Sequence, residues 1–180
     1  MDRYGWQGWL GWCGALAISL GLVGLAVLPP FVGETARGLV MQAFAGVCHQ
    51  LPSRSPQIGG VALAVCDRCV GIYGGLALGV LGFATATRWH DAAYRHAGPV
   101  LAAALVPPVV DWIGPVLGLW ANAPLSRAVT GAFFGVAAGY VLARVVVRAA
   151  AGTPSDARGA AEGSVDAGSA AAEGSLRPGQ

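Results

Sequence analysis

The chain has 180 residues, of which 55% are hydrophobic and only 11% are charged. Soluble domains carry roughly 25% charged residues, so this composition is typical of a membrane protein. The formal net charge of +2 is small and scattered along the chain, and we therefore expect no nucleic-acid partner.

The distribution of apolar residues predicts an all-α polytopic membrane protein with four transmembrane helices, in a membrane domain of residues 1–149. Each apolar run is long enough to cross a hydrocarbon layer of ~30 Å. The expected spans are residues 9–31, 70–87, 98–119 and 124–147. Three prolines are expected to break the third span: Pro107, Pro108 and Pro115. Residues 150–180 are rich in Ala, Gly and Ser and are expected to form a disordered tail.

Between the first two spans, residues 33–47 carry spaced polar side chains and predict a short amphipathic helix at the membrane interface. This helix leads into a Cys/His-containing loop, residues 48–69. Within the loop, the apolar residues 58–65 are expected to dip towards the membrane or to belong to a longer helix.

Two spans carry glycine at every fourth position, which allows a second helix backbone to approach closely in lipid. These glycines are Gly71, Gly75 and Gly79 in the second span, and Gly131, Gly135 and Gly139 in the fourth. The expected partners are the lipid bilayer and, through these glycine faces, a second copy of the chain.

Four crossings place both termini on one side of the membrane and the Cys/His loop on the other. Arginines near the span ends are more numerous on the side of the termini. The positive-inside rule therefore predicts a multi-pass protein of the cell membrane with both termini in the cytoplasm.

Most of the side chains that could bind a metal lie in the Cys/His loop. Cys66 and Cys69 are separated by two residues, which brings two thiols within reach of one ion or of each other. Cys48 adds a third sulfur, and His49 is a candidate fourth ligand of a tetrahedral zinc site. If His49 points away, it becomes a candidate catalytic base beside a metal with an open position. Cys13 lies within the first span and is expected to be only a small apolar residue.

These cysteines could also form a plain structural disulfide with one spare thiol, and two other functions remain open for the polar residues. A membrane thiol-disulfide oxidoreductase linked to quinone would need no metal and would use a redox-active Cys66–Cys69 disulfide. A small transporter or lipid-binding module would instead use Asp111 and Arg127, since an ionisable side chain within a span indicates a functional site. We expect these two to pair, at the same membrane face as Cys48. Asp111 is also a candidate catalytic residue, although the sequence assigns no reaction.

Arg54 and Arg68 add to the polar groups at this face. A guanidinium at a membrane surface binds phosphate or carboxylate well, so both are candidates for contacting a substrate or supporting the metal site, together with Asp111 and Arg127.

The run from Cys48 through Pro52 to Ser55, followed by Cys66-x-Arg68-Cys69-x-Gly71, resembles a prokaryotic membrane family filed as domain of unknown function twenty eighty-five. A later segment that contains Asp111 and the run from Arg127 to Gly135 is similar to that family's second motif, and the resemblance covers about residues 38–140. It implies an integral membrane protein with these polar positions as its signature, and it supplies no activity. Val70 and Trp112 depart from the family pattern, which usually has threonine and glycine there.

Overall fold

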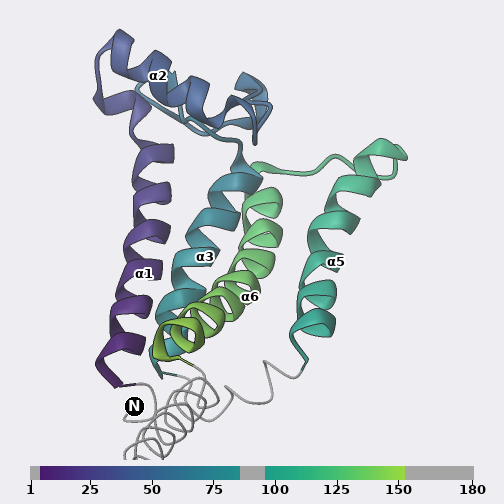
Figure 1. Ribbon diagram of the computed structural model, residues 1–180. Helices are drawn as coiled ribbons and strands as arrows, with labels where there is room; N and C mark the ends of the chain where they lie inside the picture. The colour runs from purple at the N-terminus through teal and green to yellow at the C-terminus, as the bar shows by residue number, and fades with distance from the viewer. Residues whose placement is uncertain (1–4, 86–95, 153–180) are drawn as a thin grey trace, which may run out of the picture.

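The computed structural model describes residues 5–85 and 96–152, and four of its helices are long and apolar enough to cross a membrane. They alternate in direction, so that both ends of the described chain lie at one face of the bundle and the cysteine loop lies at the other (Figure 1). The spans are α1 Gly5–Val27, α3 Asp67–Thr85, α5 Ala97–Val116 and α6 Pro124–Ala151. The expected all-α, four-span fold is confirmed.

The bounds of the spans differ from the expected ones in ways that matter for the site. α1 ends at Val27 because Pro29–Phe31 forms a 3-10 turn. α3 begins at Asp67, so Cys66 directly precedes the helix and Cys69 lies in its first turn. The expected end of the second span at residue 87 lies outside the described residues. Of the expected tail, residues 150 and 151 belong to α6, and residues 153–180 lie outside the described residues.

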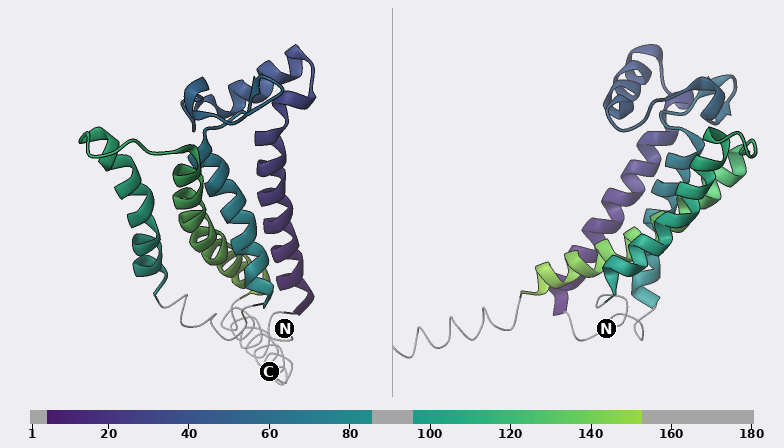
Figure 2. Two further views of the ribbon diagram at one scale, coloured as in Figure 1. Left: turned by 180° about the vertical axis from the view of Figure 1, so that it is seen from behind. Right: turned by 90° about the vertical axis from the view of Figure 1, so that its right-hand side faces the viewer.

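The segment between α1 and α3 forms a cap over one end of the bundle. The expected interfacial helix is present as α2, Glu34–Ala45, which lies across the spans (Figure 2). Residues 58–65 do not form part of a longer helix, because β1 Gln57–Ile58 pairs antiparallel with β2 Val61–Ala62. The alternative, that this segment dips towards the membrane, stays a prediction. Gly59 and Gly60 have φ of 58° and 79°, and such positive values suit the tight two-residue turn of a hairpin.

The two glycine faces pack against each other inside the chain. A Cβ atom at Gly75 would lie 2.5 Å from the carbonyl oxygen of Ala132, and one at Gly135 would lie 2.2 Å from that of Ile72. The backbones of α3 and α6 therefore touch along this seam. Because each face is covered by the other, neither is free to pair with a second copy of the chain.

α6 packs against each of the other three spans, and α1 also packs against α3. Trp12 on α1 donates a hydrogen bond from Nε1 to the carbonyl of Val80 on α3, at 2.8 Å. A core around Ala15, Val80 and Ala143 fills the space between α1, α3 and α6.

α5 stands at the side of the bundle, beyond α6 (Figures 1 and 2). It is continuous from Ala97 to Val116, so the expected break at its prolines does not occur. A proline lacks the N–H that would bond the carbonyl one turn earlier, but membrane helices tolerate this loss when neighbouring groups satisfy the backbone. Chain reversal comes later, at Leu117 and Gly118, where the Gly118 φ is 69°.

Candidate metal centre

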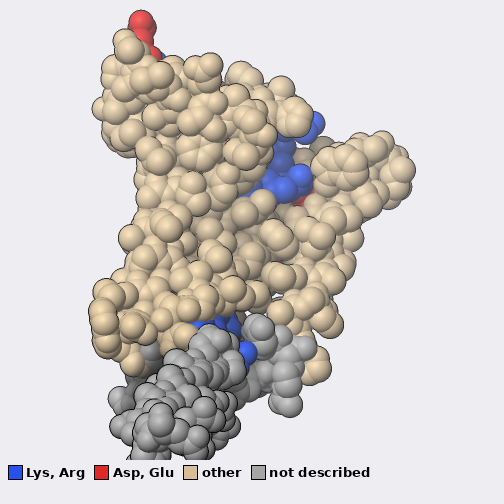
Figure 3. Space-filling view, viewed as in Figure 1, with Lys and Arg blue, Asp and Glu red and all other residues tan. Residues whose placement is uncertain are grey.

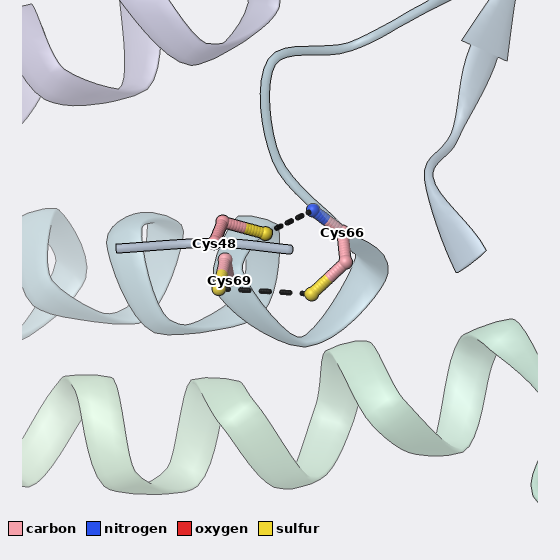
Figure 4. Close-up of side chains that lie close together, drawn as sticks. All are labelled: Cys48, Cys66 and Cys69. Carbon is pink, nitrogen blue, oxygen red and sulfur yellow. Dashed lines mark hydrogen bonds between the residues drawn. The ribbon is translucent and has the colours of Figure 1, made fainter. Parts of the chain in front are cut away.

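Three cysteines converge where the cap meets the start of α3. Cys48 follows α2 and is buried, Cys66 directly precedes α3, and Cys69 lies in its first turn (Figure 4). Their three sulfurs all lie within 4.8 Å of one another. The Cys66 and Cys69 sulfurs are 3.6 Å apart, and the backbone N–H of Cys66 donates to the Cys48 sulfur at 3.2 Å.

The spacing of the sulfurs suits a shared metal ion. A disulfide needs an S–S bond of ~2.05 Å, and all three cysteines are free. Tetrahedral zinc with Zn–S bonds of ~2.3 Å places two ligand sulfurs ~3.8 Å apart. The Cys66–Cys69 separation of 3.6 Å is close to that value. The three sulfurs therefore lie close enough together that they could hold one metal ion.

The cap holds these thiols through Gln50, which lies in the motif that begins at Cys48 but was given no role from the sequence. Its side-chain amide donates to the carbonyls of Met41 and Ala64, at 2.6 and 2.8 Å. Its φ of 49° is unusual for a residue other than glycine. Gln50 thus links α2 to the segment that runs from β2 to Cys66. The sequence signal that could have pointed to a role for Gln50 is its position two residues after Cys48.

Packing beneath the cap fixes the same segment. Ala26, Phe44 and Val65 form a buried cluster with Cys48, and the N–H of Ala64 donates to the carbonyl of Ala26 at 3.0 Å. The cysteine loop is therefore anchored to the end of α1, so a metal bound here would tie the cap to α3.

His49 lies differently from its predicted place. It is exposed, and its nitrogens are not among the ligand atoms that lie within 4.8 Å of one another. A fourth ligand from His49 would need the side chain to turn inward. Its role stays a prediction.

The sulfurs also influence one another's protonation. Cys66 lies just outside the α3 span, and a hydrogen bond with the Cys69 thiol lowers the pKa of Cys66 to about 5 against the opposing effect of burial. A thiolate at Cys66 is the form that binds metals and attacks electrophiles.

We expect Cys66 in the metal-free protein to be alkylated by iodoacetamide at a rate that falls only below about pH 5, since the thiolate persists down to its pKa. An ordinary thiol with a pKa of ~8.5 would lose most of its rate by about pH 7. The rate at Cys66 is measured by mass spectrometry across pH. Cys69→Ala removes the hydrogen bond and should move the midpoint upward; a wild-type midpoint near pH 8 would contradict the prediction.

Two ion pairs join α3 to its neighbours beside the thiols, and they are not the expected pair. Arg68 bonds Asp111 on α5, whereas Arg127 on α6 bonds Asp67 with an N–O distance of 2.9 Å. The expected Asp111–Arg127 pair is therefore wrong, although both residues lie at the expected face. Asp67 was missed because an aspartate beside Cys66 gave no sign of its partner.

Asp111 also accepts hydrogen bonds from neighbouring polar side chains. Ser126 Oγ donates at 2.9 Å and Asn122 Nδ2 at 3.1 Å. The Asn122 amide oxygen in turn accepts from Arg127 at 3.4 Å, which connects the two ion pairs. Such a network satisfies charges that would be costly near the membrane if they were unpaired.

We expect Arg68→Gln and Asp111→Asn each to destabilise the protein by up to about 3 kcal/mol, because each leaves a partly buried charge without its partner. The double variant should be destabilised by clearly less than the sum of the two. Unfolding in mild detergent measures all three variants. The matched cycle of Asp111→Asn with Arg127→Gln should show smaller coupling, and a larger coupling there would overturn the observed pairing.

Beside this network lies a cavity of about 330 Å³, between the starts of α3 and α6 and the end of α5. Cys66 lines it, as do the arginines at positions 54, 68 and 127. The candidate thiol centre and all three arginines singled out from the sequence therefore meet at one site.

The fold and the site define a polytopic membrane protein with a cluster of three free thiols at one membrane face. The chain belongs to the family described as "Predicted membrane protein (DUF2085)", whose model matches residues 48–141, from Cys48 into α6. This confirms the resemblance noted from the motifs.

One curated relative supports the family assignment. The chain is 35% identical over 85 residues to the uncharacterised protein MJ1492 of Methanocaldococcus jannaschii, an alignment that covers 47% of this chain and 54% of the relative. The chain thus spans about half the length of the curated relative it matches. No solved structure matches the chain.

Proposed function

We propose that this membrane protein binds one zinc ion through Cys48, Cys66 and Cys69. The observation that carries the proposal is the approach of three free sulfurs to within 4.8 Å of one another from two separate parts of the chain. Thiolates are soft ligands that favour zinc over magnesium or calcium, and zinc in structural sites is almost always bound by four ligands in a tetrahedron.

The fourth ligand decides what the zinc ion does. If His49 turns inward, the site is closed and the metal stabilises the cap on α3. If water takes that position, the site is open, and His49 or Asp111 is the candidate proton acceptor. The contact of Cys66 with the cavity supports the open form, because it brings the thiol cluster to a space that a ligand can enter.

The test is to measure metal content and free thiols on the same detergent-purified sample, without added metal or reductant. About one zinc per chain, released by a chelator together with three newly titratable thiols, is the expected result. A metal-free protein with an oxidised Cys66–Cys69 pair would overturn the proposal.

A thiol oxidoreductase is the second candidate, favoured by the lowered pKa of Cys66 and the 3.6 Å separation of the two sulfurs. In that reaction the Cys66 and Cys69 thiols form a disulfide and pass two electrons and two protons to an acceptor of the quinone class, which becomes a quinol. A Cys66–Cys69 disulfide that forms with added quinone and disappears with reductant would support it.

We further propose that the protein lies in the cell membrane with both termini in the cytoplasm. The arginines near the described end of α6, Arg144 and Arg148, support this orientation. Arg68 at the opposite face belongs to an ion pair and so gives little topological information. The thiols would then face an oxidising space, where a bound metal protects them from oxidation. A reporter fused after the last residue tests the orientation.

A further inference from the structure

The cavity beside the thiol cluster has a strongly one-sided charge. Its charged lining consists of Arg54, Arg68 and Arg127, with no aspartate or glutamate among the described residues that line it. Figure 3 shows the basic side chains gathered in a hollow between the cap and the end of α5.

The carboxylates nearby do not neutralise this charge. Asp111 pairs with Arg68 and Asp67 with Arg127, but Arg54, on the turn Pro52–Arg54, makes no ion pair within the part of the chain that the structure describes. Three guanidinium groups therefore face two carboxylates, and one positive charge remains. The buried Nε of Arg68 also lacks an acceptor among the described residues, so this guanidinium has a donor left unused.

The remaining wall of the cavity is apolar and belongs to α5. Trp112 and Val116 line it while 55% and 65% exposed, so they belong at once to the cavity and to the outer surface of a membrane span. Asn122 adds an amide on the polar side. A ligand that fits both walls has an anionic group at the arginines and an apolar part along α5.

We propose that this cavity binds a phosphate group, with Arg54, Arg68 and Arg127 as its ligands. One guanidinium group can donate two parallel hydrogen bonds to two oxygens of a phosphate. Three guanidinium groups around one cavity therefore suit the several oxygens of a phosphate group. A volume of about 330 Å³ holds a head group but not whole acyl chains, which would leave along Trp112 and Val116. The apolar wall favours an anionic phospholipid over free phosphate. The proposal goes beyond the metal site and does not depend on it.

The test compares three probes in detergent by titration calorimetry: dioctanoyl phosphatidic acid, dioctanoylglycerol and inorganic phosphate. We expect one phosphatidic acid per chain, bound at least about 10-fold more tightly than dioctanoylglycerol, which has the same chains without phosphate. Arg54→Gln should weaken phosphatidic acid binding roughly 10- to 100-fold, the effect expected from losing hydrogen bonds to a charged group.

The control variant is Arg37→Gln. Arg37 lies on α2 at the same membrane face, outside the cavity, and its guanidinium donates only to the carbonyls of Pro29 and Val32 in the described structure. The Arg37→Gln variant loses the same charge as Arg54→Gln, and its affinity for phosphatidic acid should stay within about 2-fold of the wild-type value. Arg54 is exposed and unpaired among the described residues, so its variant should fold; the thiol count on the same sample checks this.

The outcomes separate the sources of the phosphate. Tight phosphatidic acid binding that Trp112→Ala weakens assigns the site to a lipid head group. Equal binding of inorganic phosphate, dependent on Arg54 and insensitive to Trp112→Ala, assigns the same site to a soluble phosphate. The proposal is overturned if neither phosphate probe binds better than dioctanoylglycerol, or if Arg54→Gln and Arg37→Gln weaken binding equally.

Discussion

Cys66→Ser should purify with less than about one tenth of the zinc of the wild-type protein, because a hydroxyl is a poor substitute for a thiolate ligand. Losing a residue that only hydrogen-bonds to a metal ligand already lowers metal affinity roughly 10- to 100-fold, and losing the ligand itself should lower it more. Cys48→Ser and Cys69→Ser should behave alike, since the three sulfurs belong to one cluster. Elemental analysis of detergent-purified samples measures the effect.

Cys13→Ser is the matched control for these variants. Cys13 is exposed on α1 and takes no part in the cluster, so its replacement should leave the zinc content unchanged. Full metal content in Cys66→Ser, or an equal loss in Cys13→Ser, would mean that the metal is bound elsewhere or nonspecifically.

Gly79→Ala should destabilise the folded protein by roughly 1–3 kcal/mol, the usual cost of inserting an extra methyl into a filled core. The new Cβ would lie 2.2 Å from the carbonyl oxygen of Val136 and 2.7 Å from the backbone nitrogen of Tyr140. Backbone atoms cannot rotate away, so α3 and α6 would have to separate. The midpoint of unfolding in mild detergent reports the loss.

Gly82→Ala on the same helix should stabilise the folded protein instead. A Cβ there meets nothing within 4 Å, and alanine generally favours a helix over glycine by about 0.5–1 kcal/mol. The same substitution, three residues apart, is thus expected to stabilise at one position and destabilise at the other. Similar effects at both positions would show that the α3–α6 seam is looser than the structure has it.

The glycine seam also positions the candidate site. A Cβ at Gly131 would lie 2.3 Å from the carbonyl of Arg68, so the seam reaches the first turn of α3. This close approach brings Arg127 on α6 to Asp67 and places Arg127 beside the cavity. Separation of the helices should therefore disturb the arginines as well as the fold.

Much of the fold could be predicted because each transmembrane helix is dictated locally. A run of about 20 apolar residues has few alternatives in a bilayer, since every backbone group must be bonded within the segment. The same logic placed the thiols, Asp111 and Arg127 at one membrane face, since span order alone fixes which helix ends lie together. The hairpin at Gly59 and Gly60 was not predicted, because an apolar run of that length fits a strand or a helix equally well.

The sequence by itself determined the four spans, the shared face of the polar residues and the presence of three thiols within residues 48–69. Only the tertiary structure decided which partners meet. Asp67 and Arg68 are neighbours in the chain, yet successive residues of a helix point about 100° apart, so one reaches α6 and the other α5. Spacing along the chain gives the height of a side chain in the bundle, whereas its partner depends on how each helix is rotated against the next.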